Sequence, residues 1–252
     1  RITNEKDAAG KYEDRIDSLS NSFQFNRLVN TPGLNFRVNK KKYTYSFGSS
    51  VGFSHFIQKN LTDETRRNYD FINFFPRANF TYKIKASENI RFNYNGSTTA
   101  PSLEQLQPIT VNTDPLNIYI GNPELDQAFR HSFNINYSSW NALKERNMWG
   151  GMRLNLTQNA FTQFSTIDSV GRRVYQTVNV DGIYNFNVNL DYGFKIPDSQ
   201  WRLGFGPNVN INRNIDFVRD QKTNETVKNK TDTRSYGMRL NIGQYVKDKY
   251  NF

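Results

Sequence analysis

Residues 184–196 read YNFNVNLDYGFKI, and apolar and polar side chains alternate along the whole stretch. Even-numbered positions carry aromatic or aliphatic side chains, whereas odd-numbered positions carry Asn, Asp, Gly or Lys. Successive side chains of a β-strand point to opposite faces of a sheet, so this period of two predicts a strand with one apolar and one hydrated face. A helix would scatter the same apolar residues around its circumference.

The same alternation recurs in eight further stretches of the chain. They are residues 34–38, 43–57, 77–84, 90–95, 133–138, 152–157, 201–211 and 236–243, and residues 250–252 look like the start of a tenth strand. Several of these strands are long, whereas strands of globular sheets usually have about five or six residues. A strand that crosses a membrane needs about 9–11 residues. The pattern predicts an all-β, antiparallel, up-and-down sheet that can span a bilayer.

The composition of the 252 residues supports a folded β protein and excludes several other classes. The 20 Phe, 14 Tyr and 3 Trp argue against disorder. Cysteine is absent, which excludes a disulfide framework and a zinc–thiolate site. Lys and Arg exceed Asp and Glu by 33 to 23, a net charge of +10. These basic residues are spread over polar faces and loops, so we expect no nucleic-acid partner.

The predicted connections alternate between short and longer ones. The short ones are 40–42, 86–88, 142–147, 198–200 and 246–249, and the others are 60–71, 100–129, 166–172 and 219–231. In an up-and-down sheet, alternate connections lie at the same end, which here gives one tight end and one end with loops. Outer-membrane barrels have this asymmetry, with short periplasmic turns and longer extracellular loops. Trp140, Trp149 and Trp201 lie beside short turns, which predicts one aromatic girdle at the tight end.

Two other classes explain the sequence less well. A soluble β-sandwich also alternates, but it buries its apolar face between two sheets and its strands are typically short. An enzyme or metal site lacks candidates, because the only histidines, His55 and His131, are far apart and no carboxylate pair stands out. No glycine-rich phosphate loop follows a strand and opens a helix. We therefore expect a membrane barrel without catalytic activity, bound metal or cofactor.

The segment 98–129 is the longest predicted loop and contains four prolines. Ser102 is placed to cap a short helix over residues 103–106, and Gly121-Asn122-Pro123 is a turn signal. The loop also carries enough aliphatic side chains to fold back onto another part of the protein. Two interpretations stay open: the loop packs into the barrel mouth near a ligand path, or it braces the wall.

This loop also carries a family resemblance. Residues 100–108 (APSLEQLQP) and 113–137 (TDPLNIYIGNPELDQAFRHSFNINY) resemble a stretch in the barrels of TonB-dependent receptors, and most of all the outer-membrane β-barrel family common in Bacteroidetes. The shared features are a Pro-Ser-x-x-x-Leu segment, a Gly-Asn-Pro-x-Leu turn and a following strand. Residues 76–80 (PRANF) and 178–182 (VNVDG) resemble further parts of the family pattern.

The resemblance implies an integral protein of a Gram-negative outer membrane, with an N-terminal plug domain inside a barrel of about 22 strands. This chain departs from that pattern, because it has no plug and fewer than half of the strands. We expect residues 1–20 to be an irregular start and residues 21–252 to be a barrel-wall segment of nine or ten strands. Lipid cannot satisfy the bare edges of such an arc, so the expected partners include the remaining strands.

The resemblance also implies a function. The chain is expected to be the barrel portion of a TonB-dependent receptor-like transporter, for a ligand too large or too scarce for porins. The alternative is a non-transporting barrel that anchors or scaffolds a surface or secretion complex. Expected partners are outer-membrane lipid, the protein's own plug, the TonB complex and a surface lipoprotein. The candidate residues facing ligand or plug are Gln105, Gln107, Asn112, Asn122, Arg77 and Arg91.

Overall fold

The computed structural model describes residues 4–5, 11, 14–15, 23–61, 64–106, 110–114, 116–220, 223–246 and 250–251. Its elements, in chain order, are β1 (Asn4–Glu5), β2 (Asp14–Arg15), β3 (Phe23–Asn30), β4 (Gly33–Asn39), β5 (Tyr43–Asn60), β6 (Arg66–Lys85), β7 (Glu88–Thr99), α1 (Leu103–Leu106), β8 (Thr110–Asp114), β9 (Asn117–Ile120), β10 (Ala128–Asn141), β11 (Arg146–Gln158), β12 (Ala160–Ile167), β13 (Arg173–Val180), β14 (Ile183–Lys195), β15 (Trp201–Arg219), β16 (Thr226–Val246) and β17 (Tyr250–Asn251). β1 and β2 pair with each other, and the other strands form one 15-stranded sheet.

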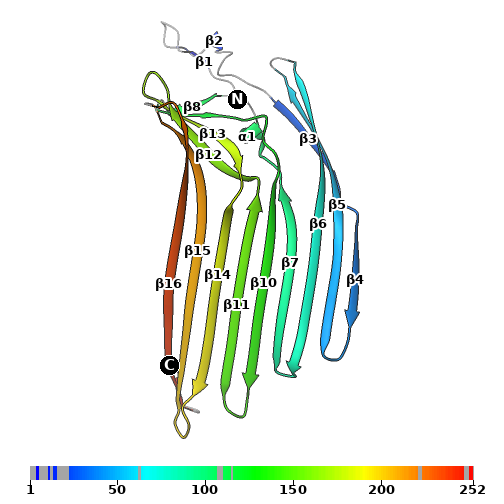
Figure 1. Cartoon of the computed structure of the whole chain (residues 1–252), viewed down its shortest axis with the longest axis vertical. Helices are drawn as coiled ribbons and strands as arrows, with labels where there is room; N and C mark the ends of the chain where they lie inside the picture. The colour runs from blue at the N-terminus through cyan, green and yellow to red at the C-terminus, as the bar shows by residue number, and fades with distance from the viewer. Residues whose placement is uncertain are drawn as a thin grey trace.

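A wall of long antiparallel strands makes up most of this sheet (Figure 1). Its order is β3 with β4, then β5, β6, β7, β10, β11, β14, β15 and β16. β3 and β4 form one edge strand, because both pair with β5 in the same register and only Thr31-Pro32 interrupts them. Proline lacks the N–H that a ladder needs and is tolerated at a sheet edge. The wall therefore has the nine predicted strands, and β17 begins a tenth along β16.

The register aligns the predicted alternation of every strand with that of its neighbours. Directly opposite residues in antiparallel strands share a face of the sheet. One row across the wall consists of Val38, Tyr45, Phe80, Phe92, Ile135, Met152, Val188, Val209 and Tyr236. The adjacent row, on the opposite face, consists of Arg37, Ser46, Asn79, Asn93, Asn134, Arg153, Asn187, Asn210 and Ser235. We call these sides the apolar face and the polar face.

The height of the apolar face fits a bilayer. On β14 it extends from Tyr184 to Phe194 without a polar interruption. Ten residue steps of about 3.3 Å give about 33 Å along the strand. A tilt of about 35–45°, usual in membrane barrels, reduces this length to an apolar band about 25 Å tall. Within the described residues, no helix is long and apolar enough to cross a membrane.

The wall has a tight end and an open end, as the sequence predicts. The connections between β4 and β5, β6 and β7, β10 and β11, and β14 and β15 form the tight end. Two loops predicted at the open end are shorter than expected, because β5 continues to Asn60, β6 begins at Arg66 and β16 begins at Thr226. The predicted bounds of these loops, 60–71 and 219–231, were therefore wrong. These strand ends extend past the apolar band, so alternation no longer marks them.

The prediction of one tryptophan girdle needs a correction. The tryptophans do lie toward the tight end, but neighbouring positions along a strand face opposite sides. Trp149 is opposite Ser138 and Asp191, and thus lies on the polar face. Trp140 likewise aligns with the polar-face positions, whereas Trp201 belongs to the apolar face. Nearness to a turn gives the height of a side chain in the wall and does not give its face.

The open end contains a strand exchange that the sequence analysis missed. β12 continues β11 and β13 continues β14, yet the order beside β15 changes from β15-β14-β11 to β15-β12-β13. β12 and β13 form a hairpin, and the positions of its two strands are exchanged relative to β11 and β14. The exchange occurs at Asn159 and Asp181-Gly182, a point we call the crossover. Asn159 has φ 49° and Gly182 has φ +101°. Both values lie in the left-handed region, which Gly and Asn adopt most readily.

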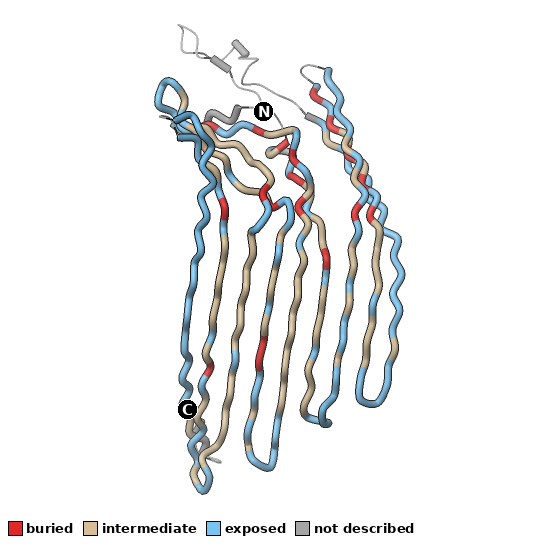
Figure 2. The backbone as a smooth tube through the Cα atoms, in the orientation of Figure 1, coloured by how far each residue is buried: buried red, intermediate tan, exposed pale blue. Residues whose placement is uncertain are grey.

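Buried side chains gather at the open end (Figure 2). One cluster at the crossover consists of Ala160, Val180 and Ile215, with Ile183 and Phe217 packed against it. Leu106 and Phe56 are the most fully buried large side chains. In the first twenty residues, expected to be irregular, β1 and β2 form a ladder of two residue pairs. Below the open end, the described part of the wall is a single layer without a cluster of buried apolar side chains.

Candidate functional site

The polar face is a continuous surface of amide and hydroxyl groups. Besides the row described above, a second row consists of Asn39, Thr44, Thr81, Arg91, Asn136, Gly151, Asn189, Asn208 and Gly237. A third consists of Asn35, Gly48, Arg77, Asn95, Ser132, Asn155, Asn185, Asn212 and Thr233. The rows cross all nine strands.

Neighbouring amides on this face hydrogen-bond to one another. The amide nitrogen of Asn185 donates to Oδ1 of Asn210 at 3.4 Å and to Asn212. Arg153 Nε donates to Oδ1 of Asn134 at 2.7 Å. An asparagine side chain has two donors and two acceptor lone pairs, so each retains capacity for a further partner. The polar face therefore can hold a second surface by many hydrogen bonds between uncharged groups.

Two of the predicted contact residues, Arg77 and Arg91, lie on the polar face. Both side chains are exposed. Arg77 Nη2 donates to Ser50 Oγ at 3.3 Å on the neighbouring strand. Arg91 stands between Thr81 and Asn136 in its row. Their positions suit contact with something inside the barrel, and that contact stays a prediction.

The long loop is held to the crossover hairpin through two of the motifs noted in the sequence. Asn122, in the Gly-Asn-Pro turn, donates from Nδ2 to the carbonyl of Thr177 at 3.0 Å. Asn179 accepts at Oδ1 from the backbone N–H of Asp126 at 2.9 Å and donates from Nδ2 to the Asp126 carbonyl at 3.1 Å. Its Nδ2 also lies 2.7 Å from the carbonyl of Asn159. Asn179 thus joins the loop, β13 and the crossover.

We call α1, β8, β9, β12, β13 and residues 121–127 the mouth assembly. β9 pairs in parallel with β13, and β12 pairs in parallel with the end of β15 at Phe217 and Val218. The Thr162 hydroxyl donates to the Ile215 carbonyl beside this ladder. Of the two interpretations of the loop, these contacts favour the one in which it braces the wall.

The remaining predicted contact residues belong to the mouth assembly or border it. Gln105 Oε1 accepts from the N–H of Ser102 at 2.9 Å, while Ser102 Oγ accepts from the N–H of Gln105 at 3.3 Å. This capping box confirms the predicted helix over 103–106. Gln105 and Asn122 therefore hold the loop together, and any ligand contact by them stays a prediction. Asn112 lies in β8, and Gln107 lies outside the described residues.

An aromatic cluster on the polar face near the open end was missed by the sequence analysis. Phe56 is 1% exposed and packs against Phe25 and Phe71, at ring-centroid distances of 5.6 and 5.4 Å. Tyr69 stacks on Phe71, and the Arg27 guanidinium lies 5.1 Å from the Phe56 ring centroid. The sequence feature that could have revealed this cluster is the presence of aromatic rings at positions of the polar face.

The two histidines and the acidic side chains form no metal site in the part of the chain that the structure describes. No group of three or more His, Asp and Glu side chains there could hold a metal ion. His55 Nδ1 lies 2.5 Å from Oδ1 of Asp70. His131 Nδ1 lies 2.9 Å from Oη of Tyr94, on a different part of the wall.

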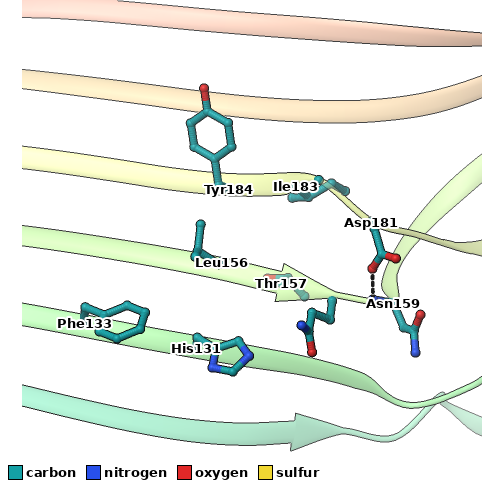
Figure 3. A pocket seen from close by; sticks show the side chains of 10 residues that line it. His131, Phe133, Leu156, Thr157, Asn159, Asp181, Ile183 and Tyr184 are labelled. Atoms are coloured by element: carbon teal, nitrogen blue, oxygen red, sulfur yellow. Dashed lines mark hydrogen bonds between the residues drawn. The ribbon is translucent and has the colours of Figure 1, made fainter.

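A hollow of about 670 Å³ lies under the crossover. His131, Phe133, Leu156 and Tyr184 project into it from three neighbouring strands (Figure 3). These residues belong to the apolar face of the wall. The hollow is closed toward the open end by the crossover, where the N–H of Asn159 donates to Oδ1 of Asp181 at 2.8 Å.

The chain is similar to known proteins in sequence profile and, more distantly, in fold. The sequence profile of the "Outer membrane protein beta-barrel family" matches residues 2–252. No curated protein has a sequence that matches the chain. The solved structure of the siderophore receptor PirA from Pseudomonas aeruginosa is similar with a TM-score of 0.48 and 9% identity, over 91% of this chain and 52% of that one. The outer membrane transporter YddB from Escherichia coli is similar with a TM-score of 0.40 and 11% identity, over 96% and 34%.

The chain thus spans about half of one of these proteins and about a third of the other. The family match and the open wall agree, since the sheet is a partial barrel with an apolar outside and a polar inside. The protein is integral to the outer membrane, with the apolar face toward lipid. The chain belongs to the outer membrane protein beta-barrel family.

Proposed function

We propose that this chain is part of the wall of a receptor-like outer-membrane transporter. The observation that supports the proposal is the polar face, where rows of amide, hydroxyl and guanidinium groups cross nine strands. A wide barrel with an open lumen would lose selectivity, and the largest outer-membrane transporters carry a plugged lumen. The polar face supplies the hydrogen bonds that would hold such a plug.

The completed barrel needs further strands. β16 and the strand formed by β3 and β4 have one neighbour each along most of their length. Unpaired backbone groups cannot face lipid, because each unsatisfied group in hydrocarbon costs several kcal/mol. In the membrane, both edges are therefore expected to pair with other strands of the same barrel. The mouth assembly would then stand at the extracellular rim, where a ligand arrives.

In the proposed mechanism the wall is passive. Ligand binds at the rim and against the plug, and energy from an inner-membrane TonB complex moves the plug relative to the polar face. The wall holds its own shape, because hydrogen bonds between amides of β11, β14 and β15 connect these strands. Arg77 and Arg91 are the proposed cationic contacts to plug or ligand, together with the asparagines in their rows.

The second candidate is an anchor for a surface complex, and the braced mouth favours it. A loop that is hydrogen-bonded to β13 at Asn122 and Asn179 presents a fixed surface, which suits a lipoprotein partner. Such a barrel would need no movement of a plug. The two candidates therefore differ in whether the interior responds to cellular energy.

The absence of cysteine makes this difference measurable. In the full-length protein, with any cysteine outside these 252 residues replaced by serine, Asn187→Cys places the single thiol on the polar face, and Asn229→Cys places it at the exposed open end of β16. In intact cells, a membrane-impermeant biotin maleimide should label Asn229→Cys rapidly and Asn187→Cys slowly. Labelling of Asn187→Cys should change when the proton gradient is collapsed.

Each outcome separates the candidates. Rapid labelling at both positions would mean an open interior, which contradicts a plugged transporter. Slow labelling of Asn187→Cys that ignores the proton gradient would favour the anchor. Slow labelling that depends on the gradient supports transport.

A further inference from the structure

We propose that the upper apolar-side surface of β15 and β16 binds a phosphorylated lipid of the outer leaflet. The surface consists of Arg213, Arg219, Lys228, Lys230, Arg234 and Asp232, which we call the basic patch. In the ladder Arg213 is opposite Asp232, Ile215 opposite Lys230, Phe217 opposite Lys228, and Ile211 opposite Arg234. All of these residues lie on the lipid-facing side of the wall.

The sequence hides this patch, because its residues come from two strands and alternate along each strand with residues of the polar face. Five cations and one carboxylate leave a net charge of +4 for the patch. Among the described residues, the one ion pair inside it joins Arg213 to Asp232 through N–O contacts of 2.7 and 2.8 Å. Lys228, Lys230, Arg219 and Arg234 are exposed.

The height of the patch matches that of lipid headgroups. Directly below the patch on β16, Tyr236 begins the run of apolar side chains that ends at Ile242. On this face Lys230 stands one row and Lys228 two rows above Arg213, about 7 and 13 Å along the strand. Cations just outside the hydrocarbon attract anionic headgroups, while their methylene stems stay on apolar surface. Lys228 makes a cation–π contact at this edge of the apolar surface, since its Nζ lies 5.9 Å from the Phe217 ring centroid.

The hollow under the crossover adjoins the patch on the same face. The Arg213 guanidinium lies 5.0 Å from the ring centroid of Tyr184, and Tyr184 lines the hollow. Leu156 and Phe133 give the hollow an apolar floor (Figure 3). A phosphate on the basic patch and an acyl chain in the hollow would thus belong to one molecule. That combination selects a phosphorylated lipid over a free anion.

The proposal is tested on the full-length protein, purified from outer membranes in a nonionic detergent. The double variant Lys228→Gln with Lys230→Gln removes two patch charges, and Leu156→Trp fills the hollow while keeping every charge. The control, Lys83→Gln with Arg239→Gln, removes two charges from the polar face. A heat-dependent shift on gels establishes that each protein is folded.

Retained lipid is extracted and measured by mass spectrometry per mole of protein. We expect wild type and control to keep phosphorylated glycolipid, and both test variants to keep about tenfold less. Equal retention by all four proteins would overturn the proposal. Loss in the Leu156→Trp variant without loss in the lysine variant would also overturn it, because the patch would then contribute nothing.

A second measurement separates a lipid from an anion. Delipidated wild type is heated with detergent micelles containing diphosphorylated lipid A, with the dephosphorylated form, or with inorganic phosphate. The expected result is a higher Tm with the diphosphorylated lipid alone. An equal rise with inorganic phosphate would mean a free-anion site, and an equal rise with the dephosphorylated lipid would mean a purely apolar one; either contradicts the proposal.

Discussion

The wall and the mouth assembly are built from the same kind of strand but specified in different ways. Between β11 and β14 the ladder runs unbroken from Arg146 to Thr157, and every pair repeats the same geometry. In the mouth assembly, single side chains make the decisive contacts, as Asn179 does with Asp126 and Asn159. A periodic structure distributes its stability over many equivalent positions. An irregular one concentrates it in a few residues.

The first prediction breaks the wall and has the largest expected effect. Leu190→Arg puts a charge on the apolar face and should cost about 2–4 kcal/mol if it lies near the midplane of the bilayer. Its neighbour provides the control. Asn189→Arg faces the interior, and the residue opposite it on β11 is Gly151, which has no side chain. Folding into lipid vesicles over a urea series measures both, and equal losses would mean that the faces are assigned incorrectly.

The second prediction breaks the mouth assembly alone. Asn179→Ala removes the three hydrogen bonds that join the loop, β13 and the crossover. Leaving the Asp126 and Asn159 groups without partners should cost about 2 kcal/mol. Protease cleavage between residues 100 and 127 should become faster, while the heat shift of the barrel on gels persists. Asn214→Ala, at an exposed position, is the control. Equally fast cleavage of residues 100–127 in this variant would contradict the role of Asn179 in holding the loop.

The third prediction concerns the crossover. Gly182 has φ +101°, and a Cβ there would meet the Ile215 side chain at 3.3 Å. Gly182→Ala should therefore destabilise the mouth assembly by about 1–3 kcal/mol. Gly171, with φ +85° and open space around it, lies at the hairpin tip. Gly171→Ala should destabilise the hairpin less than Gly182→Ala does, as measured by hydrogen exchange of β12 and β13. A larger effect of Gly171→Ala would mean that the tip, and not the crossover, stabilises the hairpin.

The smallest expected effect comes from the tight end. Hydrogen bonds from Lys195 and Arg202, at 2.9 and 2.7 Å, lower the pKa of the Glu145 carboxyl below its ordinary value of 4.5. A lowered pKa stabilises the fold above pH 4.5, and this contribution is lost as the pH falls through the lower folded-state pKa. The Tm difference between wild type and Glu145→Gln should thus shrink below pH 4.5. A difference that is constant from pH 7 to 3 would contradict the ion pairs.

This contrast explains how much the sequence could predict. The period of two in residues such as 184–196 is dictated by the two environments of a membrane wall, so strand number and facing follow from it. Above the band both faces meet water or protein, and residues 66–71 lose the pattern although they are strand. The strands of the crossover hairpin alternate too, but alternation does not specify the neighbour.

The residues of the candidate site also fall into a predictable group and an unpredictable group. The polar-face positions of Arg77 and Arg91 follow from period and register. Gln105 makes local hydrogen bonds with Ser102, within the cap that the sequence predicts. The role of Asn122 in holding the loop depends on Thr177, 55 positions away, which only the folded chain brings near. Two motifs were visible in the sequence, Gly-Asn-Pro-x-Leu in the loop and Val-Asn-Val-Asp-Gly at the end of β13. They did not show that the loop and β13 are in contact. The basic patch stayed hidden for a similar reason.

The strand exchange at the crossover also sets an order of events during assembly. β12 pairs with the end of β15, which is synthesised about fifty residues later and reaches its place only by adding to β14. The pairing of β11 with β14 must therefore form first, while β12 and β13, which continue these strands, are not yet paired with β15. We expect refolding to show a membrane-inserted intermediate whose rim is still open, and the mouth to be the last part to close.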